Sequence, residues 1–433
     1  MAEILPLKAF RYHPSFNAQM EELISPLFDV VSEKQREALY QKPYNSIHLS
    51  VPKGDQPTEE ARQLLAKWKE TQVIMQDPIP GIYVYYQYFR LPGEEKESCR
   101  KGFVAQIKAY DWSENVVLRH ENTIASSVND RIELLNATSF QPSPTHGLYE
   151  DQYHILEPYM DKAIEDPIYD LEDYQGVREV LAVIHDVDTI RKFLNVIKDK
   201  QVILADGHHR YEGAIAHRKE QASLNPDHQG DEGYNYHMMY FTNAHSKDLK
   251  ILPTHRIFYN IPLSESALLE KLTPYFTVRK LNDVDEIGEL LLQRQWAFGL
   301  VFKDQAYKIR LIPEVINQYE VAMPKAVKQL DLMVLHYFFI EKVLGIPLER
   351  QRFWDNLSYE RNLRRCISEA QDGKASFCVI TKDVTMQQVL EVCKSGFTMP
   401  QKSTYFYPKT LSGLLFASIA PEDFQFPYEV FTV

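Results

Sequence analysis

The spacing of apolar and polar residues predicts a chain that mixes strands with helices. Two apolar segments rich in aromatic residues, 81–90 and 101–110, flank the polar turn 91–97 and predict a β-hairpin. A strand at 177–184, a helix at 188–198 and a short apolar strand at 202–205 follow one another. This order indicates a βαβ-like unit. We therefore expect an α/β or α+β fold with one central mixed sheet.

Other segments extend this pattern toward both ends of the chain. Residues 46–51 alternate between polar and apolar, which predicts a strand, and 236–242 read as a buried strand. Beyond residue 261, segments 297–302 and 306–311 predict a second hairpin, and 330–344 an apolar helix that ends at Gly345. We expect a catalytic region at 1–260 and an α+β C-terminal region at 261–433.

The turn after the 202–205 strand combines a helix start with unusual charge. Asp206 is an N-cap candidate, and Gly207 is free to adopt a positive φ. Apolar positions spaced by three and four residues predict a helix immediately afterwards. Its first turn carries His208, His209 and Arg210. Cations at a helix N-terminus oppose the helix dipole, so a bound anion, above all a phosphate, would reconcile them.

Two further stretches concentrate polar side chains. His120, Glu121 and Thr123 precede Asp130 and Arg131, which is also the pattern of a capped helix start with solvated charges. Within 399–409, the run Lys402, Ser403 and Thr404 offers an ammonium group, hydroxyls and backbone donors to a phosphate, although an ordinary loop reads the same way.

Composition narrows the classes of function. The chain has 433 residues and a net charge of −12, which disfavours nucleic acid as a partner. No apolar run approaches the roughly 18 residues of a membrane span, and the N-terminus lacks the pattern of a signal peptide. The 4 cysteines form no C-x-x-C pair. We expect a cytoplasmic protein with reduced thiols.

Common nucleotide and hydrolase fingerprints do not occur. The sequence contains no G-x-x-x-x-G-K-[ST], no G-x-G-x-x-G and no G-x-S-x-G. The phosphate-binding prediction therefore depends on the turn at 206–210 rather than on a widespread signature.

Five segments in order resemble a family of bacterial and archaeal proteins known as domain of unknown function one thousand and fifteen. They are 26–30 (PLFDV), 120–123 (HENT) with 130–131 (DR), 205–211 (ADGHHRY), 253–256 (PTHR) and 399–409 (MPQKSTYFYPK). The chain departs from the family pattern at Phe28, where the family usually has Tyr, and at Val128, where it has Lys. The second departure weakens any role for a cation just before Asp130.

The turn D-G-H-H-R is more distantly similar to the nucleotide-binding turn of the ParB and sulfiredoxin superfamily. The sulfiredoxin version needs a Cys where this chain has His208, and the partition-protein version carries Glu-Arg-Arg. The free serine kinases of that superfamily share a D-G-H-x-R form. The resemblance implies a ParB/sulfiredoxin-like sheet that binds ATP or ADP with Mg²⁺ and phosphorylates a small hydroxylated metabolite, free L-serine first.

The resemblance also implies roles for individual residues. The nucleotide phosphates would be bound by two runs of residues: Asp206, Gly207, His208, His209 and Arg210, and Lys402, Ser403 and Thr404. Asp29 or Glu121 would be the general base, with His209 also in the catalytic set. Arg131, Arg256 and His120 would bind the acceptor. Asp206 would either bind Mg²⁺ or cap the helix.

Two other functions remain open at this stage. A metal-dependent hydrolase could use His120, Glu121, His208 and His209, but neighbouring histidines on a helix point about 100° apart and seldom share an ion. A switch that binds nucleotide without turnover, acting through dimerisation or a partner, is the second. A homodimer is compatible with both the kinase and the switch.

Overall fold

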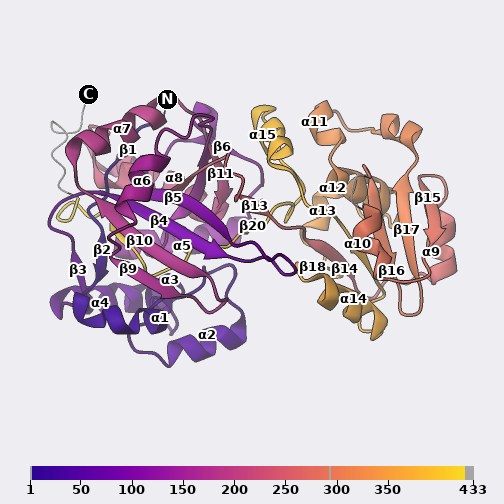
Figure 1. Ribbon diagram of the computed structural model, residues 1–433, viewed down its shortest axis with the longest axis horizontal. Coiled ribbons are helices and arrows are strands. Elements are labelled where there is room, and N and C mark those ends of the chain that lie inside the picture. The colour runs from indigo at the N-terminus through magenta and orange to yellow at the C-terminus, as the bar shows by residue number, and fades with distance from the viewer. Residues whose placement is uncertain (1, 292–293, 425–433) are drawn as a thin grey trace. The chain divides into compact units, whose positions relative to one another are not determined.

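The computed structural model describes residues 2–291 and 294–424, which form two compact units (Figure 1). Unit 1 contains the described parts of 1–119, 123–250 and 408–433, and unit 2 contains 120–122 and 251–407. The chain therefore passes between the units four times. This division differs from the expected border at 260 because 120–122 join unit 2 and the last segment returns to unit 1.

A nine-stranded mixed sheet is the centre of unit 1. Its spatial order is β6 (Val117–Arg119), β11 (Val202–Asp206), β8 (Thr145–Tyr149), β12 (Tyr236–Asn243), β5 (Ser98–Lys108), β4 (Ile82–Phe89), β10 (Arg178–Ile184) and β9 (Tyr169–Glu172), with β1 (Ile4–Leu5) paired to β5. β4 and β5 are antiparallel neighbours, which confirms the predicted hairpin. The fold is therefore α/β, as the alternation of strands and helices predicts.

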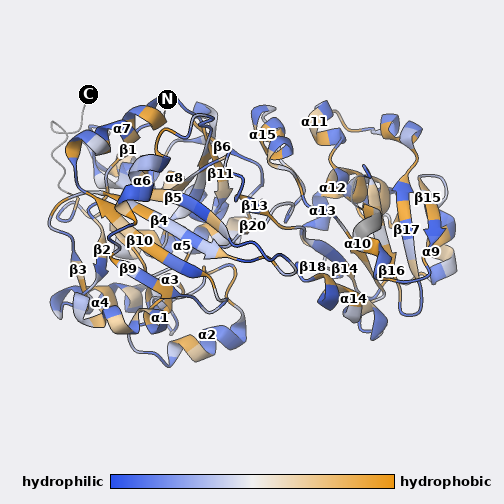
Figure 2. Ribbon diagram, viewed as in Figure 1, coloured by the Kyte–Doolittle hydropathy of each residue, from blue (hydrophilic) through white to orange (hydrophobic). Residues whose placement is uncertain are grey.

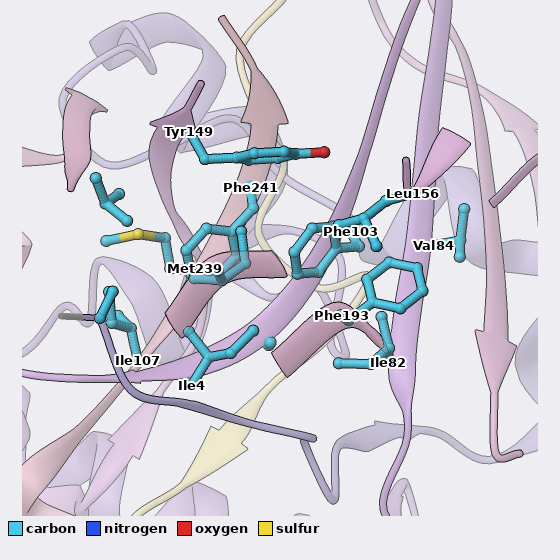
Figure 3. Close-up of a cluster of buried hydrophobic side chains, with 14 of the residues drawn as sticks. Ile4, Ile82, Val84, Phe103, Ile107, Tyr149, Leu156, Phe193, Met239 and Phe241 are labelled. Carbon is cyan, nitrogen blue, oxygen red and sulfur yellow. The ribbon is translucent and has the colours of Figure 1, made fainter. Parts of the chain in front are cut away.

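Both faces of this sheet are buried, which explains the long apolar runs in its strands. Along β4, Ile82 and Val84 belong to one hydrophobic cluster, whereas Tyr83 and Tyr85 belong to the other. The first cluster includes Phe193, which meets Phe103 edge to face at 4.9 Å (Figure 3). Hydrophobic colouring accordingly dominates the middle of the sheet, while the surrounding helices alternate (Figure 2).

Helices from several parts of the chain contribute to these two clusters. The helices of unit 1 are α1 (Met20–Leu23), α2 (Glu33–Tyr40), α3 (Ile47–Ser50), α4 (Pro57–Glu70), α5 (Ala125–Thr138), α6 (Glu157–Ala163), α7 (Val187–Lys198) and α8 (His208–Leu224). Side chains of α6, α7 and α8 belong to the first cluster, and side chains of α1 and α4 belong to the second. Short pairs complete the unit: β2 (Phe10–Tyr12) with β3 (Ile74–Gln76), and β7 (Phe140–Gln141) with β21 (Ala417–Ser418).

The predicted βαβ-like unit is present as β10, α7 and β11. Its two strands are parallel, but four other strands lie between them in the sheet. The helix is amphipathic, and Ile190, Phe193 and Ile197 are its buried residues. The unit is thus a long crossover that carries the chain from one side of the sheet to the strand preceding the 206–210 turn.

Unit 2 contains a six-stranded sheet. The strand order is β15 (Phe276–Lys280), β17 (Ala306–Leu311), β16 (Ala297–Val301), β19 (Phe377–Ile380), β14 (His255–Phe258) and β18 (Leu357–Glu360). Its helices are α9 (Glu265–Leu272), α10 (Glu286–Leu291), α11 (Lys325–Lys328), α12 (Asp331–Val334), α13 (Leu348–Gln351), α14 (Leu363–Gln371) and α15 (Met386–Lys394). β13 (Lys250–Ile251) pairs with β20 (Phe406–Tyr407).

Two predicted elements differ from the structure. Residues 46–51 are not a strand, because Ile47–Ser50 form helix α3. In that single turn Ile47, Leu49 and Ser50 are all buried, so the alternating pattern did not distinguish strand from helix. The predicted helix 330–344 begins as α12 and continues as a π-helical segment, Leu335–Val343, before Gly345 at φ 78°. Such wide turns are rare and have no apolar signature of their own.

Candidate functional site

The turn between β11 and α8 takes the form that its sequence requires. Gly207 is the N-cap of α8 and has φ 86°, the left-handed region that favours glycine. A Cβ atom at this position would lie 2.7 Å from Thr145 Cγ2 and 2.8 Å from Arg210 Nη2. The predicted capping role of Asp206 is wrong, because Gly207 is the N-cap and α8 has no side-chain cap or acidic residue in its first turn.

Asp206 instead lies buried between two cations of unit 1. Its Oδ1 pairs with Lys409 Nζ, and its Oδ2 accepts a hydrogen bond from Arg210 Nη2 at 3.2 Å. Burial alone would raise the pKa of Asp206, but the charges of Lys409 and Arg210 hold it well below its ordinary value. Both carboxylate oxygens are therefore engaged, and Asp206 in this arrangement does not fit the role of a Mg²⁺ ligand.

The Arg210 side chain folds back under the turn rather than extending from the helix. Its Nη1 donates to Ser143 Oγ at 2.9 Å and to the carbonyl oxygen of Pro144 at 2.6 Å. Together with the pair to Asp206, these bonds fix the guanidinium in a buried position. Arg210 thus places positive charge directly beneath the start of α8.

The two histidines of the first turn differ in their surroundings. His208 is buried, whereas His209 is half-buried. The backbone N–H of Ile124 donates to His209 Nε2 at 3.0 Å. A ring nitrogen that accepts from a backbone N–H carries no proton, so His209 is neutral in this arrangement. His209 is therefore a polar neighbour, while Arg210 and Lys409 bring positive charge to the turn.

Beside Asp206, the same face of the sheet carries further buried polar side chains. His146 on β8 is the cross-strand partner of Asp206, and its ring lies 5.2 Å from that of Tyr240 on β12. His146 Nε2 is 2.7 Å from Thr242 Oγ1. Burial, and next the charge of Arg100, lowers the pKa of His146 well below its usual range, so the ring is neutral at pH 7.

The polar row continues to the far strands of the sheet. Glu179 on β10 accepts from Tyr85 Oη at 2.6 Å and from Gln87 Nε2 at 3.0 Å. Gln87 in turn accepts from Arg100 and donates to the carbonyl oxygen of Lys409 at 3.0 Å. Burial raises the pKa of Glu179 to about 8. One connected network therefore links Glu179, through the backbone and side chain of Lys409, to Asp206.

The PLFDV and DR segments meet near the same turn. The Arg131 guanidinium lies over the ring of Phe28, 4.4 Å from its centroid. Its Nη1 donates to the carbonyl oxygen of Ser50 at 2.7 Å, and its Nε donates to Asp130 Oδ2 at 2.9 Å. Asp29 interacts electrostatically with Arg131, as does Arg210 with the opposite sign. Phe28, which replaces the usual Tyr, therefore supports a buried cation with its ring face.

A second group of predicted residues lies in unit 2. His120 Nε2 is 2.7 Å from Thr404 Oγ1, and the carbonyl oxygen of His120 accepts from Met399 N at 2.7 Å. Asn122 Nδ2 donates to Thr398 Oγ1 at 3.0 Å. The HEN segment and the 399–404 segment are thus packed together, although 276 or more residues separate them in sequence.

Arg256 is fully buried behind a cavity of this second group. Its guanidinium donates to Thr254 O and to His336 Nε2 at 3.2 Å, and it interacts electrostatically with Glu121. Burial lowers the pKa of Arg256 to about 10. Glu121 and His336 line the cavity, which measures about 670 Å³. The π-helical segment presents His336 to it.

The predicted residues thus separate into two groups. Asp29, Arg131 and 206–210 belong to unit 1, whereas His120, Glu121, Arg256 and 402–404 belong to unit 2. Sequence reasoning missed Lys409, although it closes the MPQKSTYFYPK motif. It also missed His146, Arg100 and Glu179, since isolated polar residues within apolar strands give no local signal of a shared network.

Metal clusters and membrane-spanning helices are both absent from the residues that the structure describes. No group of three or more His, Cys, Asp or Glu side chains among them is arranged to hold a metal ion. Within the same residues, no helix is long and apolar enough to cross a membrane.

Comparison with solved structures found distant neighbours. A conserved hypothetical protein from Pyrococcus furiosus is 15% identical with a TM-score of 0.36, covering 71% of this chain and 93% of that one. A free serine kinase in complex with AMP is 15% identical with a TM-score of 0.37, covering 71% and 90%. SbnI from Staphylococcus aureus, truncated at its C-terminus, is 12% identical with a TM-score of 0.34, covering 71% and 85%.

Among curated proteins, none matches this chain. The family comparison is different, because a single family matches continuously over residues 4–333, from the first strand of unit 1 to α12 of unit 2. That span includes four of the five motif segments, the whole nine-stranded sheet and four strands of the six-stranded sheet. The chain belongs to the family described as protein of unknown function (DUF1015).

Proposed function

We propose that this protein transfers a phosphoryl group from ATP or ADP to a small hydroxylated metabolite, with free L-serine as the first acceptor to test. The observation that carries the proposal is the start of α8. Gly207 opens the helix in the left-handed region, and the first turn has neither a side-chain cap nor an acidic residue. The N–H groups of a first turn have no partner within their own helix and suit a phosphate.

Charge beside this turn supports the same function. Lys409 and Arg210 share the single carboxylate of Asp206, so the three groups together carry one net positive charge. Phosphoryl transfer depends on positive charge and donors held in place around the phosphates. His208 and His209 would add polar contacts at the helix start. Separately, we propose a phosphate-binding role for Lys402, Ser403 and Thr404 within unit 2.

The reaction that we propose is a displacement at the terminal phosphorus. The acceptor hydroxyl oxygen forms a bond to phosphorus, the bond to the nucleotide oxygen breaks, and a carboxylate takes the hydroxyl proton. Asp29 is an exposed carboxylate of unit 1 that interacts electrostatically with Arg131, and Glu121 is a half-buried one of unit 2 that interacts electrostatically with Arg256. Each within its own unit, Arg131, Arg256 and His120 are candidate ligands of the acceptor. Mg²⁺ enters only as the counter-ion of the nucleotide phosphates, because Asp206 is engaged.

The test measures phosphate transfer by the full chain from ATP, and separately from ADP, to free amino acids and small alcohols in the presence of Mg²⁺. Arg210→Ala removes the buried cation beneath α8, and Arg218→Ala removes an arginine two turns further along the same helix. We expect phosphoserine with the wild type and with Arg218→Ala. Arg210→Ala should lose at least about a hundredfold in rate, since one donor to transition-state charge contributes that much.

Nucleotide binding is measured in parallel by calorimetry. Nucleotide that binds without phosphorylation of any acceptor would contradict the kinase and support a switch without turnover. If no nucleotide binds, the assignment of the turn at 206–210 is itself wrong. Equal activity of the two arginine variants would leave phosphoryl transfer intact and place it at another site.

A further inference from the structure

A small cavity lies beneath the turn of unit 1, on the side of Arg210 that faces Arg131. It measures about 40 Å³, and the polar residues that line it include Arg131, Arg210, Ser50, Ser143 and His237, with Phe28 on the apolar side. A single water molecule needs roughly 10–15 Å³ of such space. The cavity therefore has room for a carboxylate or a phosphate group, and it is too small for a nucleotide.

Three of its buried polar atoms have no hydrogen-bond partner among the residues that the structure describes. They are Ser50 Oγ, Arg210 Nε and His237 Nδ1. The three residues are 2%, 8% and 3% exposed. Buried polar atoms are nearly always hydrogen-bonded, and each one that is not lowers the stability of the fold. Their presence around one cavity indicates a ligand there rather than three independent defects.

All three atoms can donate to the same ligand. The Arg210 Nε–H and the Ser50 hydroxyl are donors. His237 Nε2 is 3.1 Å from Thr145 Oγ1, and if Nε2 accepts from that hydroxyl, Nδ1 carries the proton and donates. Burial lowers the pKa of His237 to about 3, so the ring is neutral at pH 7. A set of donors with no matching acceptor suits an oxyanion.

Charge around the cavity favours the same ligand. Arg131 and Arg210 both line it, no carboxylate lines it, and their mutual repulsion helps to lower the pKa of Arg131, after the larger effect of burial. Asp206 and Asp130 do not line the cavity. Asp206 also pairs with Lys409, and Asp130 is largely exposed. Water would satisfy the donors, whereas an anion would also add negative charge to that which Asp130 and Asp206 already give the two guanidinium groups.

We propose that this cavity is a binding site for a small oxyanion, with Ser50, His237 and the two arginines as its ligands. The shared chemistry is that of a carboxylate or an inorganic phosphate. The inference stands without the proposed phosphoryl transfer, because it concerns binding alone. If that function holds, the carboxylate of an amino-acid acceptor is one source of the anion.

The test titrates the full chain, without nucleotide, with inorganic phosphate, acetate or L-serine at constant ionic strength and follows the unfolding midpoint and the heat of binding. We expect a saturable rise of the midpoint. Arg131→Met should weaken the binding at least tenfold, and Ser50→Ala, which removes a hydroxyl without a partner, should fold normally and weaken it severalfold. Arg119→Met removes a guanidinium that pairs with Glu212 and does not line the cavity, so this variant should bind as the wild type does.

The three arms distinguish the source of the anion. If L-serine binds more tightly than acetate or phosphate, the natural ligand is an amino-acid carboxylate. If phosphate binds most tightly, the natural ligand is an inorganic or substrate phosphate. No saturable effect, or an equal effect in Ser50→Ala and Arg119→Met, overturns the proposal and leaves a water-filled cavity. If the anion binds but no acceptor is phosphorylated, the proposed phosphoryl transfer is wrong and the oxyanion site stands.

Discussion

At the scale of single residues, the most informative contact is the one between Asp206 and Lys409. A carboxylate buried in a sheet is costly unless a cation pairs with it, and here two cations do. Lys409 lies 203 residues away in sequence and returns to unit 1 with the last segment of the chain. The pair therefore ties that segment to the turn at which we expect phosphate to bind.

Removal of this lysine should destabilise the protein. We expect Lys409→Met to lower the free energy of unfolding by about 3 kcal/mol or less, because Arg210 still partners Asp206. In a double-mutant cycle with Asp206→Asn, the coupling energy should lie between about 0.5 and 3 kcal/mol, measured by urea unfolding. Lys219→Met, which breaks an exposed pair with Asp111, is the control and should cost under about 0.5 kcal/mol. Equal losses in the two lysine variants would contradict a special role for Lys409.

Glu179 gives the protein a specific dependence on pH. Burial raises its pKa in the folded state to about 8, above the value of about 4 in an unfolded chain. The folded state then holds a proton that the unfolded state releases, so the stability contributed by this group is full below about pH 4 and is lost as the pH rises through 8. We expect Glu179→Gln to remove that loss, at most about 1.4 kcal/mol per pH unit. Unfolding midpoints of the wild type and of Glu179→Gln that fall in parallel between pH 4 and 9 would disprove the role of Glu179 in this pH dependence.

At the scale of elements, the junction of β11 and α8 sets the position of the candidate site. β11 shifts register against β8 between Leu204 and Asp206, which brings Asp206 opposite His146. Such irregularities are common next to functional sites because they redirect a side chain. Gly207 then turns the chain into α8. The helix also packs closely on α5. A Cβ atom added at Gly213 would lie 3.2 Å from the Cβ atom of Arg131.

Glycine at position 207 is required for two physical reasons, conformation and space. We expect Gly207→Ala to destabilise the protein by at least about 1 kcal/mol more than Gly230→Ala, since both have positive φ but only Gly207 meets neighbours under 3.0 Å. Chemical unfolding of the two variants provides the comparison. Were the two losses the same, backbone strain alone would explain the glycine, and the close packing against Thr145 would be unimportant.

At the scale of the whole molecule, each unit has its own hydrophobic core. Phe193 belongs to a cluster of unit 1, and Ile380 belongs to the cluster of unit 2. Separate cores allow separate cooperative unfolding, as is common in chains with more than one domain. The interleaved chain path does not change this argument, because burial within each unit provides most of its stability.

Calorimetry should therefore show two unfolding transitions. Phe193→Ala and Ile380→Ala each truncate a core side chain, which costs about 2–5 kcal/mol of stability. We expect each variant to lower the midpoint temperature of a different transition. The untouched transition in each variant is the internal control. A single transition that both variants lower equally would mean that the two units unfold as one.

Local patterns in the sequence were sufficient for several elements of unit 1 and for one part of the site. Alternation, amphipathic spacing and glycine position predicted β4, β5, β10, α7, β11, α8 and β12, because these features act on neighbouring residues. The motif at 206–210 identified a turn with an unusual charge for the same reason. The strand prediction for residues 46–51 was wrong, because a single buried helical turn is too short for its apolar periodicity to be recognised.

Tertiary structure decided which polar groups meet. Strand order in the nine-stranded sheet does not follow the chain, so Glu179, Gln87, His146 and Asp206 come together across strands that are far apart in sequence. The same packing brings Lys409 rather than a nearer cation to Asp206, and joins His120 to Thr404 within unit 2. Such contacts depend on which faces are buried against one another, and that is a property of the whole folded chain that no short window of sequence contains.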